Sequence, residues 1–282
     1  MANANDETTP ADAHAHEHKA VTYGSYLRID ELLALQHPMS EGPEHDELLF
    51  IVIHQVYELW FKELLHELDH AKDLFAAGES HRVQHTLKRI LTILKVLVAQ
   101  LDILETMTPL EFLSFRERLE AASGFQSDQF RQLEFTLGLK SAGVPQRFPS
   151  GSRGRAALEK RFAEPTLWDA FVHYLAREPK PNPYPIPADV LNRDVTKNIE
   201  PSSALQDVLM DLYRNDPKNA ELCERLVDLD EGMQEWRYRH VKMVERTIGI
   251  KPGSGGSSGA AYLRGTLAQP LFPDLWAIRG RL

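Results

Sequence analysis

Hydrophobic residues recur every three or four positions along most of the chain from residue 43 onward, and strand-like alternation of apolar and polar residues is scarce. The segment from Pro43 to Ala77 has no internal Gly or Pro and ends before Gly78, a residue that commonly terminates helices. As one helix it would reach about 50 Å. The pattern therefore predicts an all-α fold, a helical bundle built on long helices.

A helix start is predicted where Thr108 and Glu111 form a capping box around Pro109. The apolar spacing continues after this start, and we expect the helix to end near Gly124. Gly, Pro and Ser are frequent at residues 141–155, which favours a loop there.

The last long helix is predicted to begin at Asp216 and Pro217 and to end at Gly249. Its apolar positions are separated alternately by four and three residues, a spacing typical of a helix–helix packing seam. The seam consists of Leu222, Leu226, Leu229, Met233, Trp236, His240 and Met243. A histidine thus occupies a position at which an apolar side chain is expected.

The proline-rich stretch at residues 179–187 cannot be helical. It could link two domains, or it could connect shorter helices that pack onto the same bundle. Residues 1–20 are polar and His-rich, with no apolar core of a secretory signal. We expect residues 1–20 to form a tail and residues 21–282 to form a single all-α domain.

Composition excludes several function classes. The chain has 282 residues and a formal net charge of −9, which argues against general nucleic-acid binding. No apolar run is long enough to span a membrane. The single cysteine, Cys223, excludes an internal disulfide and suits the cytoplasm. Because twelve histidines accompany that one cysteine, a metal site would have to use histidine or carboxylate ligands.

His240 is the first residue that could carry chemistry. A histidine in an apolar seam is more often a core residue with a satisfied hydrogen bond than a ligand. Trp236, Met243 and Val244 surround it in the helical pattern, and no acidic partner lies one turn away on the same face. A neutral imidazole in apolar surroundings also suits an axial ligand of haem.

His54 is the second candidate. It lies in a helical stretch that is apolar nearly all round, with Phe50 and Tyr57 on the same face. One interpretation is a core histidine bonded to a backbone carbonyl. The other is a polar group that projects into an aromatic-walled cavity.

Two Glu-x-x-His sequences, at residues 63–66 and 67–70, resemble di-iron motifs. A di-iron site needs such motifs on two facing helices, together with carboxylates from two more. Both copies here are adjacent on one predicted helix. We therefore expect them to form a solvated helix face.

A loop rich in Gly and Ser occupies residues 253–259. It matches neither the P-loop nor the dinucleotide-binding pattern, and a flexible linker is one interpretation. A loop of small residues can also bring backbone N–H groups and hydroxyls close to an anion. Arg116 could then supply a bidentate carboxylate contact, although taken alone it would be interpreted as a surface arginine.

Four separated motifs, in this order along the chain, together resemble the tryptophan 2,3-dioxygenase family. They are YGSYL at residues 23–27, FIVIHQVYELWFK at residues 50–62, SGFQS at residues 123–127 and the loop GSGGSSG at residues 253–259. The similarity extends from about residue 21 to the C-terminus. It implies an all-α enzyme containing haem b that inserts O2 across the indole C2–C3 bond of L-tryptophan and gives N-formylkynurenine.

The resemblance also implies a role for each matching residue. His240 would be the proximal iron ligand, with Trp236, Ser123 and Gly124 around the haem. His54 would face the indole N–H as the catalytic histidine. The other implied substrate-binding residues are Phe50, Ile51, Val52, Ile53, Phe112, Arg116 and Ser254. Family members are homotetramers, so Tyr23, Tyr26 and Leu27 are expected to act in a neighbouring subunit's site.

Two positions depart from the family pattern. The family usually has Thr where this chain has Ser254, and some bacterial members have Tyr where it has Phe112. Because phenylalanine cannot hydrogen-bond a carboxylate, Arg116 would carry more of that recognition. The alternatives are an indoleamine 2,3-dioxygenase-type enzyme with broader substrates, or a haem-binding helical module without catalysis.

Overall fold

The computed structural model describes residues 20–42, 44–120, 122, 124–177, 183–253 and 259–282. Within these ranges the regular structure is helical and includes no strand, which confirms the predicted all-α class. The chain divides into two compact units, Met1–His37 and Pro38–Leu282. The sequence predicted a boundary after residue 20, whereas these units meet after residue 37. A single domain over residues 21–282 stays a prediction.

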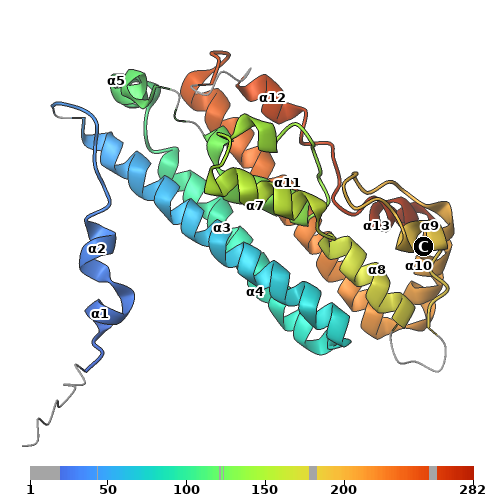
Figure 1. The fold of residues 1–282 in the computed structure, drawn as a ribbon. Helices are drawn as coiled ribbons and strands as arrows, with labels where there is room; N and C mark the ends of the chain where they lie inside the picture. Colours follow the sequence, from blue (N-terminus) through green and yellow to red (C-terminus); the bar gives the residue numbers. More distant parts are fainter. Residues whose placement is uncertain (1–19, 43, 121, 123, 178–182, 254–258) are drawn as a thin grey trace, which may run out of the picture. The chain divides into compact units, whose positions relative to one another are not determined.

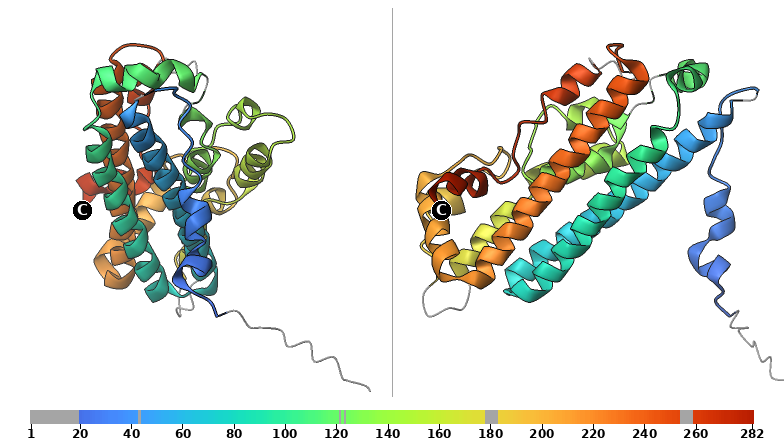
Figure 2. Two further views of the ribbon diagram at one scale, coloured as in Figure 1. Left: turned by 90° about the vertical axis from the view of Figure 1, so that its left-hand side faces the viewer. Right: turned by 180° about the vertical axis from the view of Figure 1, so that it is seen from behind.

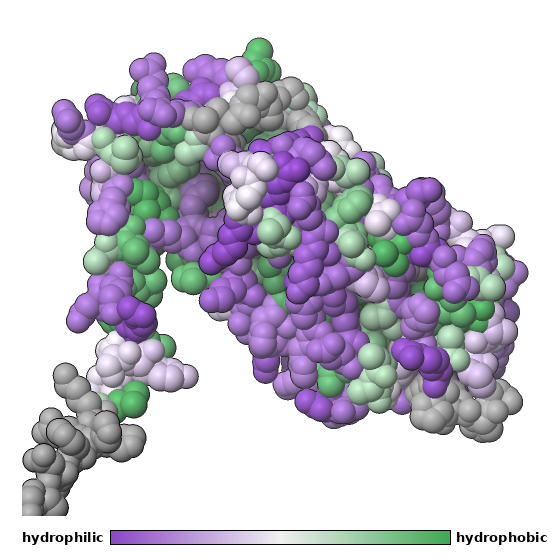
Figure 3. All heavy atoms as spheres, in the orientation of Figure 1, coloured by the Kyte–Doolittle hydropathy of each residue, from purple (hydrophilic) through white to green (hydrophobic). Residues whose placement is uncertain are grey.

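The first unit contains two short helices, α1 (Tyr23–Leu27) and α2 (Ile29–Leu33). Thr22 caps α1 in a reciprocal capping box with Ser25. Many large side chains of this unit are exposed, and green spheres along it in Figure 3 mark the aliphatic ones. The exposed side chains are Val21, Tyr23, Tyr26, Leu27, Leu32, Leu33 and Leu35.

Three long helices form the centre of the second unit: α3 (His45–Ala77), α4 (Ser80–Leu104) and α11 (Pro217–Ile248). Helix α4 packs against both α3 and α11 (Figures 1 and 2). Gly78 ends α3 with φ of 77°, a left-handed conformation that glycine adopts without steric cost. The helix bounds predicted at Ala77 and Gly249 are confirmed.

The core of this unit follows the apolar stripes of the sequence. Helix α4 buries Val83, Leu87, Ile90, Leu94, Leu97 and Leu101, and each is at most 2% exposed. Burial of one such side chain stabilises a fold by about 1.5–3 kcal/mol. At the crossing of α11 and α4, a Cβ on Gly232 would lie 3.3 Å from Leu94 Cδ1. The glycine therefore allows these two helices to approach closely.

Shorter helices cover the three long ones. They are α5 (Pro109–Arg116), η1 (Glu117–Leu119), η2 (Gly124–Gln126), α6 (Asp128–Thr136), η3 (Pro145–Arg147), α7 (Arg153–Ala163), α8 (Leu167–Arg177), α9 (Ala188–Leu191), α10 (Ser203–Asn215), α12 (Ala260–Arg264), α13 (Pro273–Ala277) and η4 (Ile278–Arg281). Helix α8 packs on α3, and α10 packs on α11. The helices on either side of the proline-rich stretch thus lie on one bundle, as in the second interpretation above.

Two predicted boundaries are wrong. The helix that begins with the Thr108–Glu111 capping box ends at Arg116 instead of near Gly124. A single 3-10 turn follows it, and Glu120 then takes a φ of 46°, which no helix can continue through. Helix α7 begins at Arg153, within the predicted loop, because Ser152 caps it through its side chain.

The expectation of a solvated face at residues 63–70 is also wrong in part. Glu67 is only 3% exposed and accepts a hydrogen bond from Arg89 at 2.6 Å. Asp69 accepts a 2.8 Å bond from Arg161 Nη2, which joins α3 to α7. No group of three or more potential metal ligands of the His, Cys, Asp and Glu types occurs among the described residues. These acids therefore hold helices together.

In the part of the chain that the structure describes, no helix combines the length and apolar character needed to cross a membrane. The face of the second unit seen in Figure 3 is largely hydrophilic where α7 lies.

Candidate functional site

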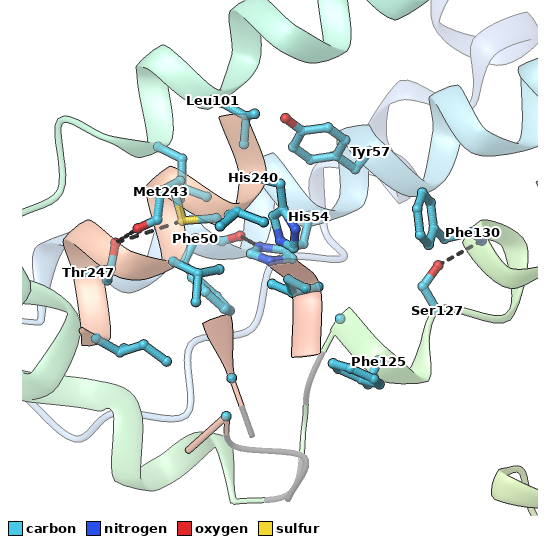
Figure 4. Close-up of a pocket in the computed structure, with 18 of the residues that line it drawn as sticks. Phe50, His54, Tyr57, Leu101, Phe125, Ser127, Phe130, His240, Met243 and Thr247 are labelled. Carbon is cyan, nitrogen blue, oxygen red and sulfur yellow. Dashed lines mark hydrogen bonds between the residues drawn. The ribbon is translucent and has the colours of Figure 1, made fainter. Parts of the chain in front are cut away.

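A cavity of about 250 Å³ lies among α3, α4, α5, α6, α11 and α12. Its walls are mainly aromatic and aliphatic, and two histidines, three arginines and two glutamates interrupt them. Figure 4 shows that His54, from α3, and His240, from α11, lie beside one another in the middle of this cavity. The two histidines singled out from the sequence thus belong to one site.

His54 combines the two interpretations offered for it. Its Nδ1 lies 2.7 Å from the carbonyl oxygen of Phe50, as in a core histidine. Because a carbonyl can only accept, Nδ1 carries the proton, and Nε2 keeps a lone pair. Burial lowers the pKa of His54, against weaker opposing effects of the Phe50 carbonyl and the Glu58 charge. The ring is therefore neutral at pH 7.

Aromatic rings enclose the His54 side of the cavity. The Phe50 ring centroid lies 4.1 Å from that of His54 and 5.8 Å from that of Phe112. Phe115 closes the cluster, 5.6 Å from Phe50. Tyr57, one turn after His54, donates its hydroxyl to the Leu97 carbonyl at 2.7 Å. These contacts hold an apolar, aromatic wall in place beside the His54 ring.

His240 lies in a different environment. Its ring stacks on that of Trp236, with centroids 5.1 Å apart and planes 9° from parallel. Among the described residues it has no hydrogen-bond partner. Burial lowers its pKa to about 4, and positive charge on His54 or Arg131 would act in the same direction. A neutral imidazole with a free nitrogen is the form that binds a metal ion.

Arg116 also reaches this cavity, and it contacts the start of the Gly/Ser-rich loop. Its Nη2 donates to the Pro252 carbonyl at 2.6 Å. Gly259, at the other end of the loop, has a φ of 62°, and a Cβ there would lie only 2.7 Å from the Lys251 carbonyl oxygen. The two ends of the loop are therefore held together at the edge of the cavity.

Sequence reasoning missed a cluster of three charged residues on the cavity wall. Arg131 Nη1 bonds to Glu134 Oε2 at 2.5 Å, and Arg237 Nη2 lies 3.3 Å from Glu134 Oε1. An Arg and a Glu three residues apart resemble an ordinary surface pair on a helix. Only the burial of all three, at most 9% exposed, distinguishes this cluster.

The remaining predicted residues fall into four groups. Phe50, Phe112, Gly124 and Trp236 line the cavity together with the two histidines and Arg116. Ile51, Val52 and Ile53 do not line it: Ile53 is buried in the core, whereas Val52 is 39% exposed. Ser123 and Ser254 lie outside the described residues. Tyr23, Tyr26 and Leu27 belong to the first unit, where they are exposed.

The side chains present fit a haem. His240 offers one neutral nitrogen donor, and aromatic side chains supply the apolar walls that a flat macrocycle needs. At Gly124, a Cβ would meet no other atom within 4 Å. Gly124 therefore leaves open space at the cavity wall, beside which a flat group has room.

Known proteins resemble the chain over most of its length. Residues 8–184 and 192–282 match the family model described as tryptophan 2,3-dioxygenase. A tryptophan 2,3-dioxygenase of Herpetosiphon aurantiacus is 60% identical over 267 residues, which cover 94% of this chain and 99% of that protein. Proteins with the same name from Anaeromyxobacter sp. and Caulobacter vibrioides are 56% and 42% identical, over 96% and 93% of this chain and 99% and 98% of their own lengths.

Proposed function

The chain belongs to the tryptophan 2,3-dioxygenase family, and from this membership we propose that it inserts O2 across the indole C2–C3 bond of L-tryptophan to give N-formylkynurenine. The observation that supports this most strongly is the placement of His54 and His240 on two helices around one aromatic cavity. A haem-binding module without catalysis would need only the second of these histidines.

His240 would hold the haem iron through its free imidazole nitrogen. Its lowered pKa keeps the ring neutral near pH 7, so iron does not compete with a proton. Trp236 stacks against it and fixes the orientation of the ring. Gly124, together with Ser123, would leave room over the macrocycle. When bound, haem supplies the activation of O2, which no side chain can provide.

His54 would face the substrate. The proton on its Nδ1 is held by the Phe50 carbonyl, which leaves Nε2 as an acceptor for the indole N–H. The Phe50 ring lies beside it and would contact the face of the indole. These two groups would orient the C2–C3 bond, because a fixed geometry is the main contribution a protein can make to this step.

Arg116 would bind the carboxylate of the amino acid. A guanidinium can form two parallel hydrogen bonds with a carboxylate, and Phe112 beside it has no polar atom to share this contact. Ser254 would contact the amino-acid head group. For Ile51, Val52 and Ile53 the assignment to substrate binding rests on the sequence motif alone, because they do not line the cavity.

We also infer a homotetramer in which Tyr23, Tyr26 and Leu27 complete the site of a neighbouring subunit. The exposed fractions of these side chains, 78%, 77% and 43%, support a partner surface for the first unit. The cytoplasm is the location that fits a lone, fully buried cysteine, Cys223.

An absorption spectrum tests the cofactor assignment. Full-length protein expressed with haem supplied should show a Soret band, and His240→Ala should lose most of it. His81→Ala, at an exposed histidine of α4, is the matched control and should keep the band. An undiminished band in His240→Ala would refute the proximal assignment.

Substrate kinetics test the reaction. We expect strong preference for L-tryptophan over D-tryptophan and tryptamine, and a steep rise in KM for L-tryptophan in Arg116→Ala. Arg118→Ala, at an exposed residue outside the cavity, should behave like wild type. Similar turnover of all three compounds would instead indicate an indoleamine 2,3-dioxygenase-type enzyme. If haem-loaded protein consumed no O2 with any of them, the chain would be a non-catalytic module.

A further inference from the structure

Three charged side chains on the cavity wall have no role in the reaction described above. Arg131 and Glu134 lie one turn apart on α6, and Arg237 lies on α11 between Trp236 and His240. All three line the cavity. Their side chains are 8%, 11% and 4% exposed, respectively, so water screens them poorly.

The cluster carries one positive charge too many. One carboxylate, that of Glu134, serves both guanidiniums, at 2.5 Å from Arg131 and 3.3 Å from Arg237. Among the described residues, neither arginine forms another ion pair. A buried charge without a counter-charge costs several kcal/mol, so a compensating anion is expected nearby.

The other carboxylate of the cavity, Glu58, does not supply this charge. Its Oε2 accepts a 2.8 Å hydrogen bond from Gln129, and its charge raises the pKa of His54 against the larger effect of burial. No ion pair joins it to Arg131 or Arg237 within the described ranges. The surplus charge is therefore left for a group that enters the cavity.

The Arg131 side chain is preorganised to bind such a group. Its guanidinium lies over the rings of Phe125 and Phe130, 5.2 and 5.3 Å from their centroids, which restricts its motion. Only one of its five N–H groups bonds to a described residue. Its partner Glu134 also pairs with Arg237, which lies three residues before His240 on α11, whereas Arg116 contacts the loop at Pro252.

We propose that Arg131, supported by Arg237, binds a carboxylate of the macrocycle that His240 holds, namely a propionate group of haem. This proposal rests on the proposed function. A free guanidinium edge and a carboxylate form a bidentate pair, and the bound carboxylate would make the cluster neutral. The amino-acid carboxylate has its own candidate partner in Arg116.

The rate of haem loss from the full-length holoprotein measures this contact. An excess of a haem scavenger traps the released haem, and the Soret band reports the rate. We expect Arg131→Gln to raise the dissociation rate constant about tenfold to a hundredfold, because a charge-assisted contact is lost. Arg131→Lys keeps the charge without the bidentate geometry, so its rate should lie between those of wild type and Arg131→Gln.

Arg239→Gln is the matched control. Arg239 lies on the same helix, two residues after Arg237, but it pairs with Asp102 outside the cavity and its side chain is 30% exposed. Its substitution should leave the rate of haem loss unchanged.

The dimethyl ester of haemin separates charge recognition from packing, because esterification removes both carboxylates and keeps the ring. Wild type loaded with the ester should lose it about as fast as Arg131→Gln loses haem. Arg131→Gln should lose haem and ester at similar rates. If the substitution accelerated the loss of haem and ester by the same factor, Arg131 would act only through packing and the proposal would be overturned.

Two further outcomes would contradict the assignment of Arg131 to a haem propionate, each for a different reason. If Arg131→Gln left haem loss unchanged and raised KM for L-tryptophan but not for tryptamine, the bound carboxylate would be that of the substrate. If the wild-type protein held neither haem nor its ester, this proposal and the proposed function would both fall. An unaltered His240→Ala spectrum would by contrast refute only the proximal ligand.

Discussion

Two groups of buried charge in this molecule are built in opposite ways. Asp169 on α8 and Arg193 after α9 form a closed pair: Arg193 Nε and Nη2 donate to the two carboxylate oxygens at 2.5 and 2.8 Å. Thr166 adds a backbone and a hydroxyl donor at 2.7 and 2.8 Å, and Arg193 Nη1 bonds to the Lys197 carbonyl. Within this pair each charge faces its counter-charge, and both carboxylate oxygens accept hydrogen bonds.

The cluster of Arg131, Glu134 and Arg237 is open by comparison. Its two guanidiniums share one carboxylate, and it borders the cavity instead of a packed interface. A closed pair stabilises the protein whether or not a ligand is present. An open cluster lowers the stability of the empty protein and recovers that free energy only when an anion binds. The difference indicates that the closed pair stabilises the fold, whereas the open cluster is suited to bind an anionic ligand.

Breaking the closed pair should have the largest effect on stability. Asp169→Asn leaves Arg193 buried without a counter-charge, and we expect the free energy of unfolding to fall by about 3–5 kcal/mol. Urea denaturation measures this loss. Asp194→Asn, at an exposed acid of the same segment, should cost less than about 1 kcal/mol. Equal losses in the two variants would show that the buried Asp169 pair contributes no more to stability than an exposed acid does.

Removal of the shared carboxylate of the open cluster should have the second-largest effect on stability. Glu134→Gln leaves two guanidiniums in the cavity wall, and we expect haem-free protein to lose about 3 kcal/mol. Adding Arg131→Gln to the same chain should restore part of that loss, because only one cation then remains. Glu159→Gln, in the surface pair with Arg155, serves as the control. A double variant less stable than the single one would contradict the charge argument.

As the pH falls, protonation of His240 in the cavity should lower the free energy of unfolding before protonation of Asp169 in the closed pair does. The pKa of His240 is lowered to about 4, so below pH 6.5 the unfolded chain binds a proton that the folded haem-free chain does not. Stability should fall between pH 6.5 and 4, by up to about 3 kcal/mol from this residue. The lowered pKa of Asp169 places its own loss below pH 4. In His240→Leu the decline above pH 4 should be shallower, with a remainder from His54.

The smallest effect is expected from Arg131→Gln in haem-free protein. Removal of the surplus charge stabilises the fold, whereas loss of the Arg131 contacts with the Phe125 and Phe130 rings destabilises it. Because the two effects oppose each other, we expect the net unfolding free energy to change by less than about 1 kcal/mol. Haem should stabilise this variant less than it stabilises wild type. A large loss of stability without haem would mean that the open cluster maintains the fold after all. In that case the contrast with Asp169 would disappear.

Much of the scaffold could be predicted from local pattern. The ends of α3 and α11 follow from Gly78, Pro217 and Gly249, whose backbone preferences act without tertiary contacts. The end of α5 could not be predicted, because the apolar spacing continues beyond Arg116 while the chain turns at Glu120. The solvated face expected near Glu67 failed because its partner, Arg89, lies 22 residues away.

The sequence by itself determined the helical class, the long helices and the two histidines, because periodicity, caps and motifs are local properties of a chain. Only the tertiary structure decided that His54 and His240 share one cavity, and that Arg131 and Arg237 depend on a single carboxylate. The physical reason is that charge balance and burial belong to the neighbourhood of a residue. Segments more than a hundred residues apart build that neighbourhood, and here α11 supplies Arg237 to Glu134 of α6.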